Sequence, residues 1–246
     1  MKPGLFLVPV FHWAIILPAL CSAASYTVTD LGTLGRNNSF AYGINASGQV
    51  TGSAETSQVD QSGNHIQHAF LYDGTMHDLG TLGGGLSLGY GINSSGQVTG
   101  VSNLSRGGQH AFLYDGTMHD LGTLGGSFSQ GFGINSSGQI VGSSLTSSSS
   151  SDAFLYDRIH GMVDLNSLIN PSSGWVLASG AAINDAGQIT GSGFIGGQDH
   201  AFLLTPIVSE PSSLILAALG VIGLAAWGWR RVRLQPCGLH GIRRSA

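Results

Sequence analysis

The chain repeats three short phrases in a fixed order, and this repetition limits its fold more than any other feature. The first phrase reads D-L-G-T-L-G, the second I-N-x-x-G-Q-[VI]-x-G, and the third H-A-F-L-Y-D-G. The asparagines of the second phrase, Asn45, Asn93, Asn135 and Asn184, are 48, 42 and 49 residues apart. A period of about 40–50 residues is typical of the blades of a β-propeller.

The other two phrases recur at the same rhythm. The first begins at Asp30, Asp78 and Asp120, and a degenerate form, D-L-N-S-L, begins at Asp164. The third begins at His68 and His110, becomes D-A-F-L-Y-D at Asp152, and shortens to H-A-F-L-L at His200. The repeat region therefore extends over almost the whole of residues 26–205.

Each phrase predicts a short strand or a tight turn. In H-A-F-L-Y both alternating sets of positions are apolar, which indicates a strand covered on both faces, as in stacked sheets. The pairs Asp73-Gly74 and Asp115-Gly116 suit a hairpin, because glycine accepts the positive φ of such turns. The segment from Asn93 to Gly96 has Asn first and Gly fourth, a type I turn signature. Four short strands per repeat follow, which is the content of a propeller blade.

The two ends of the repeat region complement each other. Residues 26–35 carry the phrase of a last strand with no repeat before it, and residues 200–204 carry a third strand with no hairpin after it. The first segment would complete the last sheet, close a ring and remove exposed edges. We therefore predict an all-β, β-propeller-like fold of about four blades of four short antiparallel strands, closed by the N-terminal strand. An open β-solenoid stack is the alternative.

These phrases resemble the HAF repeat family of bacterial exported proteins, named for the His-Ala-Phe triplet. The triplet at His68 and His110, with its D-G and D-L-G neighbours, carries the resemblance. The resemblance implies an extracellular location and no established activity. Asp152 replaces the histidine in the third repeat, which argues against a role that needs this histidine in every repeat.

The composition supports an all-β fold and excludes other classes. Charged residues make up 9% of the sequence and glycine fills 39 positions, whereas about 25% of the residues of a typical soluble domain are charged. Gly, Ser, Asn and Thr favour turns over helices. Nucleic-acid binding is not expected, because the only basic cluster lies near the C-terminus. Cys21 and Cys237 both lie outside the repeats, so the repeat region has no disulfide.

Both ends of the chain predict targeting segments. Residues 1–24 have a lysine, an apolar run and small residues at the end, which predicts a signal peptide cleaved between Ala24 and Ser25. An uncleaved membrane anchor is the alternative. Residues 212–229 are uncharged and long enough to cross a bilayer, and Arg230 and Arg231 follow at once. By the positive-inside rule these arginines face the cytoplasm and residues 25–211 lie outside. A buried core helix is the alternative.

The order V-S-E-P, apolar helix and arginine cluster at residues 208–233 resembles the PEP-CTERM sorting signal of Gram-negative bacteria. Ser209, Glu210, Pro211, Arg230 and Arg231 carry this resemblance. It implies processing by an exosortase, a membrane-embedded cysteine protease, and release or transfer to the cell surface. Ser209 stands where the family usually has proline, and residues 234–246 continue past the arginines as a predicted cytoplasmic tail. The β domain itself then comprises residues 25–207.

The repeats contain no clear catalytic or metal-binding motif. His77-Asp78 and His119-Asp120 suggest metal ligands, but the first and fourth repeats lack this histidine, and hydrogen bonding to turns is the ordinary use of such aspartates. The acids outside the repeated phrases, Glu55, Asp60, Asp185 and Asp199, show no pairing of the kind a glycosidase needs. We expect no enzyme activity, no cofactor and no bound metal.

These features predict an exported, non-enzymatic repeat protein that is anchored at or released from the cell surface. Its low charge and its many hydroxyl and amide groups suit association with an exopolysaccharide matrix or biofilm. A carbohydrate-active enzyme and an extracellular protein-interaction scaffold are the alternatives. The predicted location is the inner membrane, with the repeats outside the cytoplasm, and then the cell surface or medium after processing.

Overall fold

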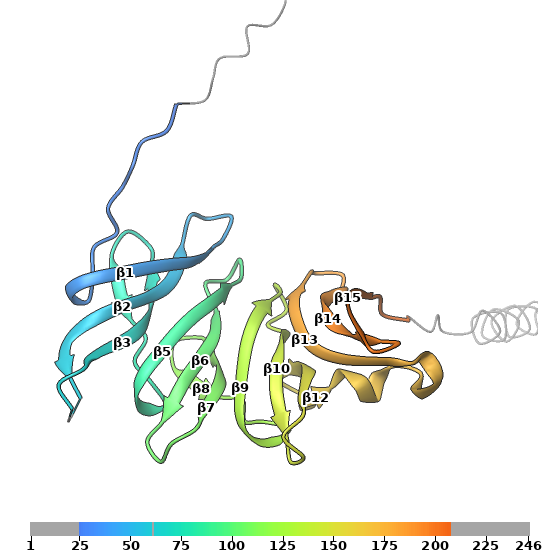
Figure 1. Ribbon diagram of the computed structural model, residues 1–246. Helices are drawn as coiled ribbons and strands as arrows, with labels where there is room; N and C mark the ends of the chain where they lie inside the picture. Colours follow the sequence, from blue (N-terminus) through green and yellow to red (C-terminus); the bar gives the residue numbers. More distant parts are fainter. Residues whose placement is uncertain (1–24, 61, 208–246) are drawn as a thin grey trace, which may run out of the picture. The chain divides into compact units, whose positions relative to one another are not determined.

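The computed structural model describes residues 25–60 and 62–207, which form an all-β fold with fifteen strands and two short 3-10 helices (Figure 1). The strands make four antiparallel groups, one for each repeat, which we call sheets A to D. Single parallel pairs, Gln67 with Leu86 and Gln109 with Phe128, link sheets A, B and C into one twelve-stranded arrangement, and sheet D is separate. Sheet A has β1 (Gly35–Ile44), β2 (Val50–Val59), β3 (His65–Tyr72) and β4 (Met76–Asp78), and sheet B has β5 (Gly83–Ile92), β6 (Val98–Leu104), β7 (Gln109–Tyr114) and β8 (Met118–Asp120). Sheet C has β9 (Gly125–Ile134), β10 (Ile140–Thr146), β11 (Ser151–Asp157) and β12 (Gly161–Asp164). The helices η1 (Leu165–Leu168) and η2 (Pro171–Ser173) lead to sheet D, with β13 (Trp175–Ile183), β14 (Ile189–Ile195) and β15 (Gln198–Leu204).

The predicted strand and turn pattern is confirmed within the repeats. Across the turn between β5 and β6, the Gly96 amide donates to the Asn93 carbonyl at 3.1 Å. β7 and β8 form the predicted hairpin around Asp115-Gly116, where Gly116 has a φ of 112°. Sheets A, B and C each have the four strands expected, whereas sheet D has three.

The predicted closed propeller is wrong. Residues 25–33 form no strand, and β15 stands at the edge of its three-stranded sheet. Sheets B and C each pack one face on the sheet before and the other on the sheet after, which leaves sheets A and D at opposite ends of a row (Figure 1). The expected closing strand directly precedes sheet A in the chain, so closure would require it to reach past sheets B and C. Residues 32–207 therefore form an open stack.

Three apolar clusters lie between successive sheets and form the core. They contain Ala69, Leu79, Val98 and Phe112 between sheets A and B; Ala111, Leu113, Leu121, Ile140 and Phe154 between B and C; and Val141, Ala153, Leu165, Leu177, Ile189 and Phe202 between C and D. Strand β7 shows why the third phrase is apolar throughout. Its Phe112 faces sheet A, while its Ala111 and Leu113 face sheet C.

An asparagine side chain ties each turn to the next repeat. The Oδ1 atom of Asn93 accepts the amides of Ser95 and Gln97, both at 3.0 Å, and so shapes its own turn. Its Nδ2 group donates to Gln97 Oε1 at 2.7 Å and to the Asn135 carbonyl at 3.0 Å. Asn45 donates in the same way to the Asn93 carbonyl at 2.9 Å, and Asn135 donates to the Asn184 carbonyl at 3.2 Å. We call this row of contacts the asparagine ladder.

Glycines allow the sheets to approach closely at each interface. A Cβ added to Gly89 would overlap the Thr51 hydroxyl of sheet A, and a Cβ added to Gly91 would lie 2.7 Å from the Phe132 carbonyl of sheet C. The positions equivalent to these two are also glycine at the other internal interfaces: Gly43, Gly131, Gly133 and Gly180. At the outer faces of the stack the equivalent residues are Ala41 in β1 and Ala182 in β13.

Replacing Gly100 with alanine is expected to destabilise the fold strongly. A Cβ at Gly100 would overlap the Leu88 carbonyl oxygen, which belongs to the neighbouring backbone and has little room to move. We expect Gly100→Ala to lower the free energy of unfolding by about 3 kcal/mol in urea titrations. Gly85→Ala is the matched control, because the nearest atom to its Cβ would be Ile66 Cγ1 at 3.9 Å. A loss as large in the control would contradict the steric explanation.

The asparagine ladder gives a second stability test. Asn93→Ala removes the acceptor of two turn amides and the donor to the next repeat, and Asn93 is only 4% exposed. We expect it to lower the free energy of unfolding by about 2 kcal/mol. Asn184→Ala should cost about half as much, because Asn184 is exposed and donates its amide only within its own turn in the described region. Equal losses would argue against the contribution of the inter-repeat bond.

Candidate functional site

The histidine of the third phrase and the aspartate of the first phrase bind each other across a strand pair. His68 Nδ1, on β3, lies 2.8 and 2.9 Å from the two carboxylate oxygens of Asp78, on β4. His110 and Asp120 repeat the contact between β7 and β8, at 2.8 and 3.0 Å. The pairs brace the short outer strand of each sheet against its neighbour.

The pairs considered as metal ligands, His77-Asp78 and His119-Asp120, do not act together. His77 Nε2 instead lies 2.8 Å from Asp73 Oδ1, and His119 Nε2 lies 2.8 Å from Asp115 Oδ1. Within residues 25–60 and 62–207, no three His, Cys, Asp or Glu side chains are grouped so that they could hold a metal ion. These side chains are hydrogen-bonded within their hairpins, which is the structural use that the sequence suggested.

The third repeat replaces the cross-strand pair with two separate contacts. Asp152 stands at the histidine position and accepts a hydrogen bond from Ser150 Oγ at 2.7 Å. Asp164, at the aspartate position, accepts from the backbone amide of Asn166 at 2.8 Å and so caps helix η1. Where aspartate replaces histidine at residue 152, Asp164 thus caps a helix and does not pair with residue 152.

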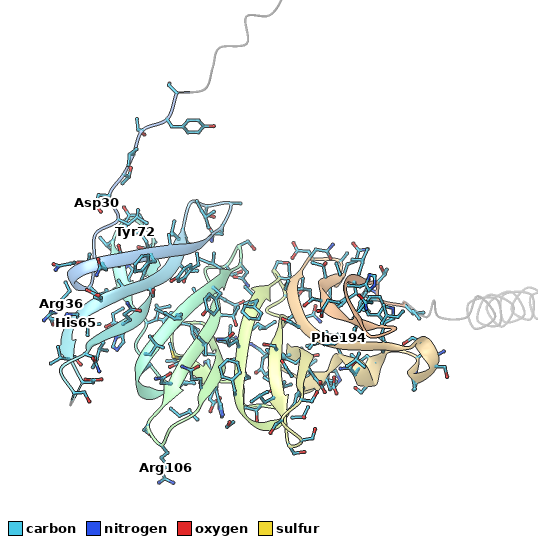
Figure 2. All side chains as sticks on the ribbon, viewed as in Figure 1. Asp30, Arg36, His65, Tyr72, Arg106 and Phe194 are labelled. Atoms are coloured by element: carbon cyan, nitrogen blue, oxygen red, sulfur yellow. The ribbon has the colours of Figure 1, made fainter. Side chains whose placement is uncertain are left out.

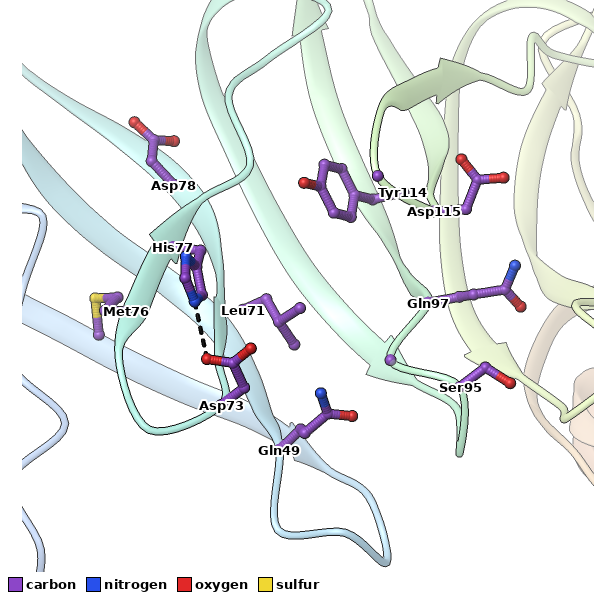
Figure 3. Close-up of a pocket in the computed structure, with 12 residues that line it drawn as sticks. Gln49, Leu71, Asp73, Met76, His77, Asp78, Ser95, Gln97, Tyr114 and Asp115 are labelled. Carbon is purple, nitrogen blue, oxygen red and sulfur yellow. Dashed lines mark hydrogen bonds and ion pairs between the residues drawn. The ribbon is translucent and has the colours of Figure 1, made fainter.

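A groove of about 890 Å³ lies between the β3–β4 hairpin of sheet A and the facing turn and hairpin of sheet B (Figure 3). Its lining includes Gln49, Leu71, Asp73, Met76 and His77 from sheet A, and Ser95, Gln97, Tyr114, Asp115 and Gly116 from sheet B. Polar groups thus surround a small apolar floor. We refer to it as the A–B groove.

The glutamines of the groove are oriented by the asparagine ladder. Gln49 Oε1 accepts from Asn45 Nδ2 at 2.7 Å, and Gln97 Oε1 accepts from Asn93 Nδ2 at the same distance. Within the described part of the chain, the Nε2 groups of both glutamines donate no hydrogen bond to protein. Each glutamine is therefore held by its oxygen and offers an amide donor to a ligand.

The hairpin aspartates of the groove are ionised at neutral pH. A hydrogen bond from His77 holds the pKa of Asp73 below its usual value. Partial burial raises the pKa of Asp115, but hydrogen bonds from His119 and Arg158 outweigh this effect, so its pKa also lies below the usual value. The two hairpin carboxylates are therefore anions that accept hydrogen bonds. The third carboxylate that lines the groove, Asp78, is bound by His68.

Arg158 binds Asp115 from the next sheet. It lies in the loop between β11 and β12, and its Nη2 atom contacts Asp115 Oδ2. The other arginines of the described region lie elsewhere: Arg36 Nη1 is 3.0 Å from His65 Nε2, and Arg106 lies at the tip of the β6–β7 loop (Figure 2). Arg158 is thus the arginine that reaches a hairpin aspartate.

The sequence did not predict this groove as a site. In the sequence, Asp73 and Asp115 are the acids of the two D-G pairs, which predict hairpins and no binding role. One signal was available, because Arg158 interrupts the D-G pair that the first two repeats share. Its contact with Asp115 on another sheet depends on the stacking distance, which a sequence pattern does not show.

The predicted processing residues lie at the margins of the described region. Ser25, after the predicted cleavage point, is exposed. Ala24, Ser209, Glu210, Pro211, Arg230 and Arg231 lie outside the described residues, as do the predicted signal peptide 1–24, the predicted helix 212–229 and the tail 234–246. A search of residues 25–60 and 62–207 finds no helix with the length and apolar character to cross a membrane.

Comparison with known protein families identifies one motif. Residues 208–232 match the PEP-CTERM protein-sorting motif, which confirms the sorting signal predicted at residues 208–233. This motif indicates export, anchoring of the C-terminus in the membrane and sorting to the cell surface, and it is generally processed by an exosortase. No curated protein and no solved structure matches the chain.

Removing the Arg158 side chain is expected to raise the pKa of Asp115 towards the usual value. NMR titration of the carboxyl carbons should show this in Arg158→Ala, while the pKa of Asp73 serves as the internal control and stays unchanged.

A depressed pKa in the folded state stabilises the fold above the unfolded-state value of about 4, and the stabilisation is lost as the pH falls through the folded value. Arg158→Ala should therefore lose less stability than the wild type on acidification below about pH 4. An unmoved Asp115 pKa would contradict the ion pair.

Proposed function

We propose that the protein is a non-enzymatic, surface-displayed repeat protein that binds the exopolysaccharide matrix of the cell that produces it, called the host below. The observation that carries this proposal is the PEP-CTERM sorting motif at residues 208–232, which follows the stacked repeat domain in the chain. A protein displayed at the cell surface is in direct contact with the surrounding matrix. The resemblance of the repeats to the HAF family of exported proteins belongs to the same proposal.

The chemistry of the A–B groove supports a sugar ligand. Tyr114 offers a phenol ring, and Gln49 and Gln97 offer amide donors fixed by the asparagine ladder. Rings and planar amides are the groups that contact the faces and hydroxyls of sugars. The groove is open at the surface, which suits one segment of a long polymer rather than an enclosed small molecule.

The titration behaviour of the two hairpin aspartates, Asp73 and Asp115, supports binding without catalysis; Asp78, which also lines the groove, is bound by His68. A glycosidase needs one carboxyl group that stays protonated as the acid and a second that is ionised. Both Asp73 and Asp115 have a pKa below the usual value, because histidine or arginine side chains donate to them. Neither one is suited to donate a proton at neutral pH.

Binding to the matrix is tested by co-sedimentation of the full chain, purified in detergent, with insoluble exopolysaccharide from the host. The wild-type protein is expected in the pellet, and Tyr114→Ala is expected to bind at least about tenfold more weakly, a loss of about 1.4 kcal/mol. Tyr72→Ala is the matched control, because Tyr72 is the equivalent residue of sheet A and does not line this groove.

Two outcomes would contradict the proposal. One is a wild-type protein that stays in the supernatant with every matrix fraction of the host. The other is hydrolysis of the polysaccharide, measured as new reducing ends, that disappears in Asp73→Asn or Asp115→Asn. The second outcome would favour the carbohydrate-active enzyme that the sequence left as an alternative.

A further inference from the structure

The repeat places equivalent residues between sheets A and B and between sheets B and C. Asp73 corresponds to Asp115, and Gly116 corresponds to Arg158. Between B and C, the Arg158 guanidinium sits on the Asp115 carboxylate. Between A and B, Gly116 has no side chain to place on Asp73, and the A–B groove is open there. The protein thus fills one of two equivalent positions with a cation of its own.

The open position is defined at the level of single atoms. In both aspartates the Oδ1 atom is bound by a histidine Nε2 at 2.8 Å, from His77 or His119. Oδ2 of Asp115 accepts from Arg158. The Asp73 carboxylate has no arginine on it; besides His77, only the backbone amides of Asp73 and Thr75 stabilise its charge among the residues that the structure describes. The side chain of Asp73 is 43% exposed, against 22% for Asp115. Asp73 therefore presents the oxygen that its equivalent uses to bind a cation.

We infer that the A–B groove binds an amino sugar of a polysaccharide, with the sugar ammonium group on Asp73 Oδ2 and the sugar ring beside Tyr114. This inference rests on the proposed function and names the class of polymer. An ammonium group forms a charge-assisted hydrogen bond with a carboxylate, as the Arg158 guanidinium does on Asp115. Figure 3 shows Asp73 and Tyr114 on opposite walls of the groove, with Gln49 and Gln97 along it.

The rest of the groove favours a sugar over an arginine side chain of a protein partner. The amide groups of Gln49 and Gln97 and the hydroxyl of Ser95 suit the hydroxyls of a sugar. A protein partner would need a deep, desolvated pocket for an apolar anchor, and only Leu71 and Met76 supply an aliphatic floor here.

The charge of the repeat region adds long-range attraction for a polymer of this class. Residues 25–207 contain three arginines against twelve aspartates and glutamates. An excess of one sign raises the local concentration of ligands of the opposite sign and speeds their association. A polysaccharide with free amino groups is cationic, so it gains from this field, whereas an acidic polysaccharide is repelled.

The test compares two oligosaccharides of equal length, a chitosan oligomer with free amino groups and the chitin oligomer in which every amine is acetylated. Isothermal titration calorimetry with the full chain in detergent should show at least about tenfold tighter binding of the amine-bearing oligomer. Asp73→Asn should abolish this preference.

The outcomes separate this inference from the proposed function. Equal binding of the two oligomers by the wild type, or a preference that survives in Asp73→Asn, would overturn the inference while matrix binding stands. Preference for an arginine-bearing peptide over the chitosan oligomer would also overturn it. Failure to bind any polysaccharide, the host matrix included, would remove the proposed function itself. Asp73 is exposed, so unfolding midpoints equal to that of the wild type will show that the variant is folded.

Discussion

The asparagine amide at each turn is the interaction on which the stack depends. Its oxygen accepts two amides of its own turn, and its nitrogen donates to a glutamine and to the next repeat. One side chain therefore fixes both the shape of a turn and the position of the next sheet. A typical hydrogen bond contributes only about 0.5–1.5 kcal/mol, but an unsatisfied buried group costs more. The amide is effective because all its hydrogen-bonding positions are used at once.

The groove shows how variation within a repeat changes the surface between two sheets. Stacking places the hairpin aspartate of one sheet next to the hairpin of the following sheet. The residue that follows the aspartate of that second hairpin, Gly116 or Arg158, determines which group contacts the first aspartate. Arg158 meets one carboxylate, and Gly116 leaves the other open. The same glutamines that support the ladder line the open groove. The open groove is thus a consequence of the packing, modified at one position.

The local structure was predictable from the sequence, and the relations between sheets were not. The N-x-x-G and D-G signatures correctly placed the turns at Asn93 and Asp115, because their backbone requirements are local. Closure of the ring depends on the angle between successive sheets, which no phrase encodes. The inter-repeat bond of Asn93 and the reach of Arg158 to Asp115 both require the stacking distance. The predicted strands and turns within a repeat were therefore correct, whereas the predicted closure between the first and last sheets was wrong.

The two alanines at the outer faces have a consequence for assembly. Identical stacking steps carry no instruction to stop, and heterologous contacts of this kind generate open filaments. At the spacing of the internal interfaces, the methyl group of Ala41 would strike the hydroxyl of Thr190 in a second copy, as a Cβ on Gly89 would strike Thr51. Ala182 opposes such growth from the other end. Both alanine methyl groups therefore oppose end-to-end stacking of two chains at the internal spacing, whereas a repeat duplicated in the middle would lengthen the stack by one interface of the internal kind.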